Sequence, residues 1–109
     1  MKKITFYIGL QDKDTKTELI KYAEACKIIA NRLDMFTITK AQGCYQYDDG
    51  SLCLENTLIV TVFENYSDNY IKVLVNNFKL DFNQECIGLE VVDNTYTYHI
   101  IFSRYAREN

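Results

Sequence analysis

The sequence lacks the residue patterns of the common metal and catalytic sites. It has four cysteines without a Cys-x-x-Cys pair and a single histidine, so the closely spaced ligands of a zinc site are missing. It also lacks a Gly-x-Ser-x-Gly elbow, a Gly-x-Gly-x-x-Gly loop and a P-loop. The sequence therefore predicts no metal site, no cofactor and no assigned catalytic residue, and it favours a binding protein over an enzyme.

Strong charge and long apolar runs are absent as well. The net charge is −3 and Lys and Arg form no basic stripe, which argues against duplex nucleic acid as a partner. No apolar run approaches the roughly 20 residues of a membrane span. The apolar start of the chain is too short for a signal peptide and ends in the polar residues 11–14, so we expect a cytoplasmic protein.

Tyrosine, in contrast, is abundant. The chain has nine Tyr and six Phe but no Trp and no Pro. Tyrosine rings are large, rigid and amphipathic, so a Tyr-rich surface suits binding contacts. A chain of 109 residues predicts one domain over residues 1–109, with enough buried surface for a core without disulfides.

Residues 43–63 predict a long β-hairpin. Asp48, Asp49 and Gly50 form the expected turn, because Asp-Gly supplies backbone conformations with positive φ. On the returning arm, apolar residues 58, 60 and 62 alternate with a mixed row at 59, 61 and 63, which is typical of a central strand. The polar residues near the turn are either an exposed hairpin tip or the wall of a site.

Apolar spacing predicts two amphipathic helices. A capping box of Thr15 and Glu18 predicts the start of the first helix. Its buried stripe is expected to be Leu19, Tyr22, Ala23, Cys26, Ile29, Ala30 and Leu33. Ser67 is expected to cap the second helix, whose stripe is Ile71, Leu74, Val75 and Phe78. The predicted core includes Phe6, Cys26, Ile29, Val60, Leu74 and Phe78.

The order of elements predicts an α+β fold. Strands are expected at residues 3–9, 36–43, 51–63, 87–92 and 95–103. The order β-α-β-β-α-β, followed by one hairpin-linked strand, is the split βαβ or ferredoxin-like pattern, with an antiparallel sheet and two helices on one face. The other face carries Tyr, Thr and Ile side chains, so we expect a homodimer or larger homo-oligomer to cover it.

Aromatic, amide and carboxylate residues predict one ligand site, where the base of the hairpin meets residues 83–85. The candidate ligand-binding residues are Tyr7, Tyr45, Tyr47, Glu55, Asn56, Gln84 and Glu85. Aromatic walls with a few polar groups suit a planar, polar ligand such as a nucleoside. The alternative is a set of ordinary tyrosines at the edge of the core with hydroxyls that reach water.

Other candidate groups have structural explanations that we favour. Glu55 and Glu85 could be an acid–base pair, but more often such residues pair with a Lys or orient a loop. His99 is more often a satisfied sheet-surface histidine than a catalytic one. Cys44 and Cys53 lie on opposite arms of the hairpin, where a cross-strand disulfide is geometrically conceivable but unexpected in a reducing cytosol.

Short segments spread along most of the chain resemble a known family. The segments are 6–10, 36–38, 43–45, 49–50, 55–58 and 82–85. Together they resemble an uncharacterised ferredoxin-like family of small bacterial and phage proteins, a domain of unknown function. That resemblance implies the fold but no activity. In this family Trp is as common as Tyr at position 45, Gly is expected in place of Asn83, and an export signal is frequent. The absence of such a signal here suggests a cytosolic or phage branch.

Three functions remain open on the sequence. The first is a non-catalytic, oligomeric protein that binds a small polar or nucleotide-like ligand; by the resemblance, it would be a phage protein that sequesters a host immune signal in the host cytoplasm. The second is an inhibitor that blocks a host protein through its exposed sheet face. The third, ranked last, is a small hydrolase or isomerase that uses Glu55, Glu85 or His99.

Overall fold

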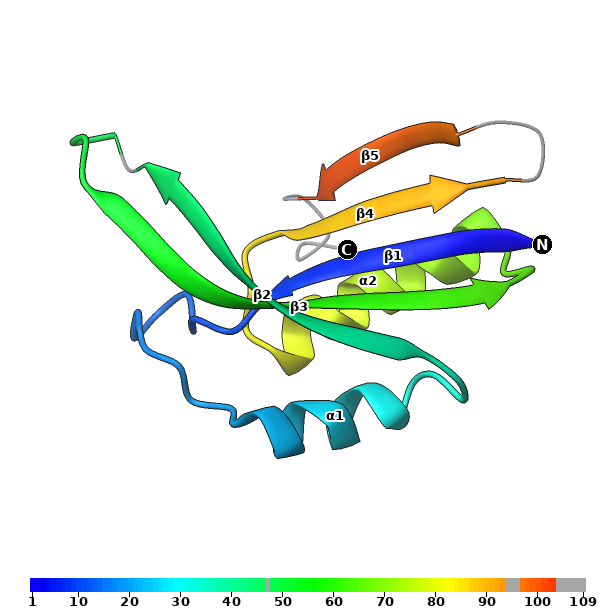
Figure 1. Ribbon diagram of the computed structural model, residues 1–109, viewed down its shortest axis with the longest axis horizontal. Coiled ribbons are helices and arrows are strands. Elements are labelled where there is room, and N and C mark those ends of the chain that lie inside the picture. The colour runs from blue at the N-terminus through cyan, green and yellow to red at the C-terminus, as the bar shows by residue number, and fades with distance from the viewer. Residues whose placement is uncertain (47, 94–96, 104–109) are drawn as a thin grey trace.

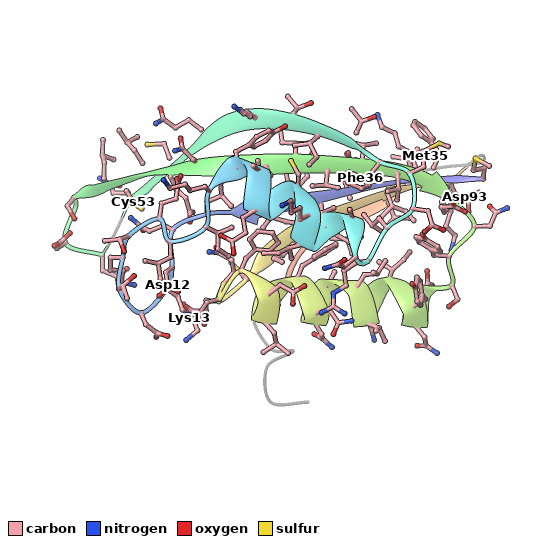
Figure 2. The ribbon with its side chains drawn as sticks, turned by 90° about the horizontal axis from the view of Figure 1, so that it is seen from below. Asp12, Lys13, Met35, Phe36, Cys53 and Asp93 are labelled. Atoms are coloured by element: carbon pink, nitrogen blue, oxygen red, sulfur yellow. The ribbon has the colours of Figure 1, made fainter. Side chains whose placement is uncertain are left out.

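The computed structural model describes residues 1–46, 48–93 and 97–103, with side chains described for all of these except Tyr45 and residues 97–103. The elements are β1 (Lys2–Gly9), α1 (Tyr22–Ala30), β2 (Thr37–Gln46), β3 (Leu52–Glu64), α2 (Asp68–Asp81), β4 (Ile87–Val92) and β5 (Thr97–Ser103). The strands form one antiparallel sheet in the order β2-β3-β1-β4-β5 (Figure 1). Both helices lie on the same side of it (Figure 2). The predicted ferredoxin-like α+β class is confirmed.

The core lies between the sheet and the helices. Side chains alternate between the two faces of a strand, and in β1 the residues that face the helices are fully buried: Ile4, Phe6 and Ile8. Phe6 lies opposite Val60 in β3 and Leu89 in β4, and each of these is buried too. Burying a side chain of this size contributes about 1.5–3 kcal/mol, so the central strand anchors the fold.

The second helix forms as its spacing predicts. The hydroxyl of Ser67 accepts a hydrogen bond of 3.1 Å from the backbone N–H of Tyr70, which satisfies one free amide of the first turn. The expected stripe is buried: Ile71, Leu74, Val75 and Phe78. The Phe78 ring meets the Phe6 ring edge to face at 5.2 Å between centroids. This contact fixes α2 against the central strand.

The first helix begins later than predicted, because residues 12–16 form a turn instead. A carboxylate oxygen of Asp12 accepts hydrogen bonds from the backbone N–H groups of Asp14 and Thr15, and Lys16 has a φ of 60°. Thr15 therefore belongs to a turn closed by Asp12. The capping-box prediction was wrong: α1 starts at Tyr22, and its N-cap residue, Lys21, makes no side-chain capping bond.

The later start also changes which side of α1 is buried. The buried residues are Ala25 and Ile29 in the helix and Leu33 just after it. Cys26, predicted in the core, is only half-buried. The residues wrongly assigned to the buried stripe are exposed: Leu19, Tyr22, Ala23 and Ala30. The error follows from counting the period from Leu19, which lies in the preceding loop rather than on the helix.

Both helices are short, with nine residues in α1 and 14 in α2. Among the described residues, no helix has the length and apolarity needed to cross a membrane. A pair of hydrogen bonds joins the segment just after α1 to the last residue of α2: Nε and Nη2 of Arg32 each donate to an oxygen of Asp81 at 2.9 Å. This bidentate geometry is the strong form of an ion pair.

The hairpin cysteines lie on opposite faces and are not bonded to each other. Cys44 is paired with Leu54 in the ladder and is exposed, whereas Cys53 is paired with Tyr45 and is buried. Neighbouring positions along a ladder point in opposite directions. The possibility of a Cys44–Cys53 disulfide is therefore excluded, and all four cysteines are free.

The packing of α2 on β1 yields a stability prediction. Phe78 is fully buried and Leu80, two residues further along the same helix, is 63% exposed. Phe78→Ala should lower the free energy of unfolding by about 3–5 kcal/mol, because it leaves a cavity beside Phe6. Leu80→Ala should change it by about 0.5 kcal/mol or less. Urea denaturation monitored by circular dichroism measures both; equal losses would contradict this core assignment.

Candidate functional site

The hairpin of β2 and β3 extends past the end of β1. The last pair between β1 and β3 is Gly9 with Thr57, whereas β2 and β3 stay paired out to Gln46 and Leu52. Figure 1 shows the hairpin projecting beyond the rest of the sheet. The sheet thus narrows to two strands directly after Gly9, and residues 53–56 lie at that step. At the tip, Gly50 has the positive φ expected of the turn, 90°.

Glu55 places its carboxyl group in the space that a side chain on Gly9 would fill. An added Cβ on Gly9 would lie 2.5 Å from the carboxyl carbon of Glu55, closer than atoms tolerate. One carboxyl oxygen accepts a hydrogen bond of 2.8 Å from the backbone N–H of Gln11. The space beside Gly9 and the backbone amide of Gln11 together hold this carboxyl group in place, and we call them its seat.

Burial changes the acidity of Glu55. The half-buried position raises the pKa of the Glu55 carboxyl group above its usual 4.5, and the hydrogen bond from Gln11 offsets only part of that increase. Glu55 makes no ion pair within the described parts of the chain, so the predicted pairing with a Lys does not occur. A half-buried carboxyl group without a paired cation can hold a proton or attract a cationic ligand.

Gln11 connects the hairpin to the loop before β4. Its backbone N–H binds Glu55, and its side-chain oxygen accepts a hydrogen bond of 3.2 Å from the thiol of buried Cys53. Its backbone carbonyl accepts a hydrogen bond of 2.7 Å from the side-chain amide of Gln84. We call Gln11, Cys53, Glu55 and Gln84, together with Gly9, the Gln11 junction. Figure 2 places Cys53 and Asp12, the neighbour of Gln11, at the same end of the molecule.

The loop at residues 82–85 is held by its own side chains. The amide nitrogen of buried Gln84 donates to the carbonyls of Gln11 and Phe82, so both of its donor hydrogens are used within the protein. Asn83 has a φ of 47°, in the region that favours glycine. Its amide donates to the carboxylates of Asp12 and Asp14 at 2.8 and 2.9 Å. These hydrogen bonds lower the pKa of each carboxyl group.

The predicted site residues separate into two groups by strand face. Tyr7 is half-buried in β1 on the face without helices, and Glu55 lies on the same face two positions beyond Thr57. Asn56 points to the other face, where its amide donates to Glu18 at 2.8 Å. Glu85 is exposed, and no hydrogen bond joins it to Glu55 within the described residues.

The remaining candidates are only partly described. The backbone of Tyr45 lies opposite Cys53, two ladder pairs from the Gly43–Glu55 pair, but its side chain is not among those that the structure describes. Tyr47 lies outside the described residues. The backbone of His99 in β5 pairs with Val91. Among the described residues, no three Cys, His, Asp or Glu side chains gather as a metal site.

Sequence reasoning missed three residues of the Gln11 junction as site residues: Gly9, Gln11 and Cys53, the last considered only for a disulfide. Gln11 is the second residue after β1 ends, and the exit of a central strand is a common place for functional groups. That position was a usable signal. Gly9 gave a weaker signal. A glycine at the end of a strand indicates that another group approaches closely, but it does not indicate which side chain that is.

The raised pKa of Glu55 predicts a pH-dependent stability. Ionising Glu55 is harder in the folded than in the unfolded chain, so the wild type loses stability as pH rises from 4.5 through the raised pKa. Glu55→Gln lacks this loss but keeps an oxygen for the Gln11 amide. The free energy of unfolding of the variant, minus that of the wild type, should therefore increase over this pH window and then level off.

Urea denaturation at a series of pH values measures this difference, with Glu85→Gln at an exposed position as the matched control. The control should stay within about 0.5 kcal/mol of the wild type. A difference for Glu55→Gln that is flat with pH, or that decreases, would contradict the burial of this carboxyl group.

Comparisons with known proteins give a fold but no family. No protein-family model and no curated protein matches this sequence. Among solved structures, the chain is similar to a phage SAM lyase in complex with S-methyl-5'-thioadenosine, with 18% identity and a TM-score of 0.71 over 97% of this chain and 91% of that one. It is similar to a phage SAM lyase in the apo state with 16% identity and a TM-score of 0.67, over 94% and 88% of the two chains. At these identities the likeness establishes a shared fold.

Proposed function

We propose that this protein binds an S-adenosyl ligand, S-adenosylmethionine or its thioether fragment, at the Gln11 junction, and that it cleaves the parent compound as a lyase. One observation carries the proposal: a half-buried carboxyl group, seated on Gly9 and held by Gln11, lies at the end of the central strand. The fold around it aligns over 97% of the chain with a phage SAM lyase.

The chemistry of Glu55 suits this ligand class. S-adenosylmethionine carries a positive sulfonium group, and a half-buried carboxylate without a paired cation attracts such a charge. A bound cation would also lower the raised pKa of Glu55, so ligand binding and ionisation should support each other. When the sulfonium leaves as a thioether, the electron pair of the broken carbon–sulfur bond stays on sulfur. The remaining fragment then closes on its own carboxylate or loses a proton to a base.

The aromatic residues predicted from the sequence supply the other half of the site. Tyr7 is half-buried on the same face as Glu55, and the backbone of Tyr45 lies two ladder pairs from that of Glu55. A Tyr45 ring stacked on adenine would contribute about 1–3 kcal/mol. Gln84 has a different role in the proposal: because its amide is used by Gln11 and Phe82, it supports the junction rather than the ligand.

Calorimetry with S-methyl-5'-thioadenosine and chromatography of S-adenosylmethionine test the proposal together. The wild type should bind the thioether and convert S-adenosylmethionine to it. Gly9→Ala should keep the fold, since the added methyl displaces only the flexible end of Glu55, yet lose both activities. Glu55→Gln should lose cleavage, and Tyr45→Ala should weaken binding at least about fivefold. Glu85→Gln is the control.

Each alternative function has its own outcome in this experiment. Binding without cleavage would support the non-catalytic ligand-binding protein, with the ligand drawn from the host cytoplasm if the chain is phage-encoded. No binding of either compound, together with loss of inhibitory activity in Tyr98→Ala, would favour the protein that blocks a host partner. Full activity in Gly9→Ala would reject the Gln11 junction as the site.

The same proposal includes self-association through the face without helices. On this face Tyr7, Ile59 and Thr39 lie opposite one another on β1, β3 and β2. Phe63, near the end of β3, is 58% exposed. We expect a homodimer or larger oligomer in sedimentation experiments. Phe63→Asp should shift the equilibrium toward the monomer, whereas Leu80→Asp on α2 should not. A monomeric wild type at high micromolar concentration would contradict this prediction.

A further inference from the structure

A separate cavity of about 220 Å³ opens on the helix side of the sheet. It lies between the loop after β1, the start of α1 and strands β2 and β3. Leu10 and Leu58 give it an apolar floor, and Glu18, Tyr22, Lys40 and Asn56 line it with polar groups. Glu55 points to the other face and is not among the lining residues. The volume equals that of about seven water molecules at roughly 30 Å³ each, which suits a molecule the size of an amino acid.

The positive charge of this cavity has no ion-pair partner among the described residues. The ammonium group of Lys40 lies 4.1 Å from the centre of the Tyr22 ring, a cation–π contact. Lys40 makes no ion pair within residues 1–46 and 48–93. An exposed contact of this kind is weak, so a ligand carboxylate can engage the ammonium group at small cost.

The negative charge of the cavity is fixed in place, and it too has no ion-pair partner in the part of the chain that the structure describes. One carboxylate oxygen of Glu18 accepts a hydrogen bond of 2.8 Å from the amide nitrogen of Asn56. An isolated antiparallel β-bridge between Gln11 and Glu18 holds the backbone of Glu18 beside the exit of β1. No ion pair joins Glu18 to Lys40 in the described chain, although both line the same cavity. The cavity therefore presents one cation and one anion above an apolar floor.

We propose that this cavity is a second binding site, which takes a free neutral aliphatic α-amino acid. The ligand carboxylate binds Lys40, its ammonium group binds Glu18 and the side-chain oxygen of Asn56, and its aliphatic side chain packs on Leu10 and Leu58. A simple anion would leave the Glu18 carboxylate facing a like charge. A simple cation would leave the Lys40 ammonium group facing a like charge. A zwitterion with an apolar tail satisfies both charges and the floor.

Calorimetry on the full chain with three ligands that share one side chain tests the proposal. L-leucine is the probe, isocaproate lacks its ammonium group, and isoamylamine lacks its carboxylate. Leucine should bind, and each analogue should bind at least about tenfold more weakly, since each loses a charge-assisted hydrogen bond. Lys40→Met and Glu18→Gln should each weaken leucine binding by a similar factor.

Two control variants locate the effect. Lys72→Met removes an exposed lysine from α2, and Glu55→Gln alters the Gln11 junction; both should bind leucine as the wild type does. Absence of leucine binding to the wild type would overturn the proposal, as would equal binding of all three ligands. The proposal would also be overturned if Glu55→Gln lost leucine binding while Lys40→Met kept it, because the amino acid would then bind at the Gln11 junction.

Discussion

The packing of β1 between β3 and β4, over the ring of Phe78, is the interaction on which the other features depend. Ile4, Phe6 and Ile8 are fully buried, and both edges of this strand are paired. Because side chains alternate along a strand, a slip of one residue would turn all three to the face without helices. The register of β1 is therefore fixed by the core, and this register decides that Gly9 is its last residue paired with β3.

The Gln11 junction is a consequence of that register. The hairpin of β2 and β3 continues where β1 ends, so Glu55 lies beside a glycine and the backbone amide of Gln11 in the exit loop. Two features compensate for the burial of its carboxyl group, the space at Gly9 and the hydrogen bond from Gln11. The compensation is incomplete, since burial still raises the pKa. A local cost of this kind is typical of functional positions.

The two faces of the sheet offer different chemistry. The face without helices carries Glu55 and Tyr7, whereas the helix side carries the cavity lined by Lys40 and Glu18. The fold shared with a phage SAM lyase spans nearly the whole chain at 18% identity. A fold of this kind hosts many activities, so the proposed function depends on the chemistry of Glu55 more than on the likeness itself.

The sequence predicted those features that depend on local spacing. Ser67 and the stripe that ends at Phe78 defined α2, because a cap and a 3.6-residue period act within one segment. Alternation defined β1 and β3 for the same reason. It also implied that Glu55 and Asn56, adjacent in a strand, point to opposite faces, although both were assigned to one site.

Only the tertiary structure decided the features that join distant segments. Thr15 fails to start a helix because Asp12 closes a turn around it, and that turn is held by Asn83, about 70 positions away in the chain. Likewise, the side-chain amide of Gln84 donates to the backbone carbonyl of Gln11 and does not face a ligand. The seat of Glu55 requires Gly9 and Gln11 to lie beside it. Contacts of this kind depend on how the strands align in space, and no periodic pattern in the sequence records them.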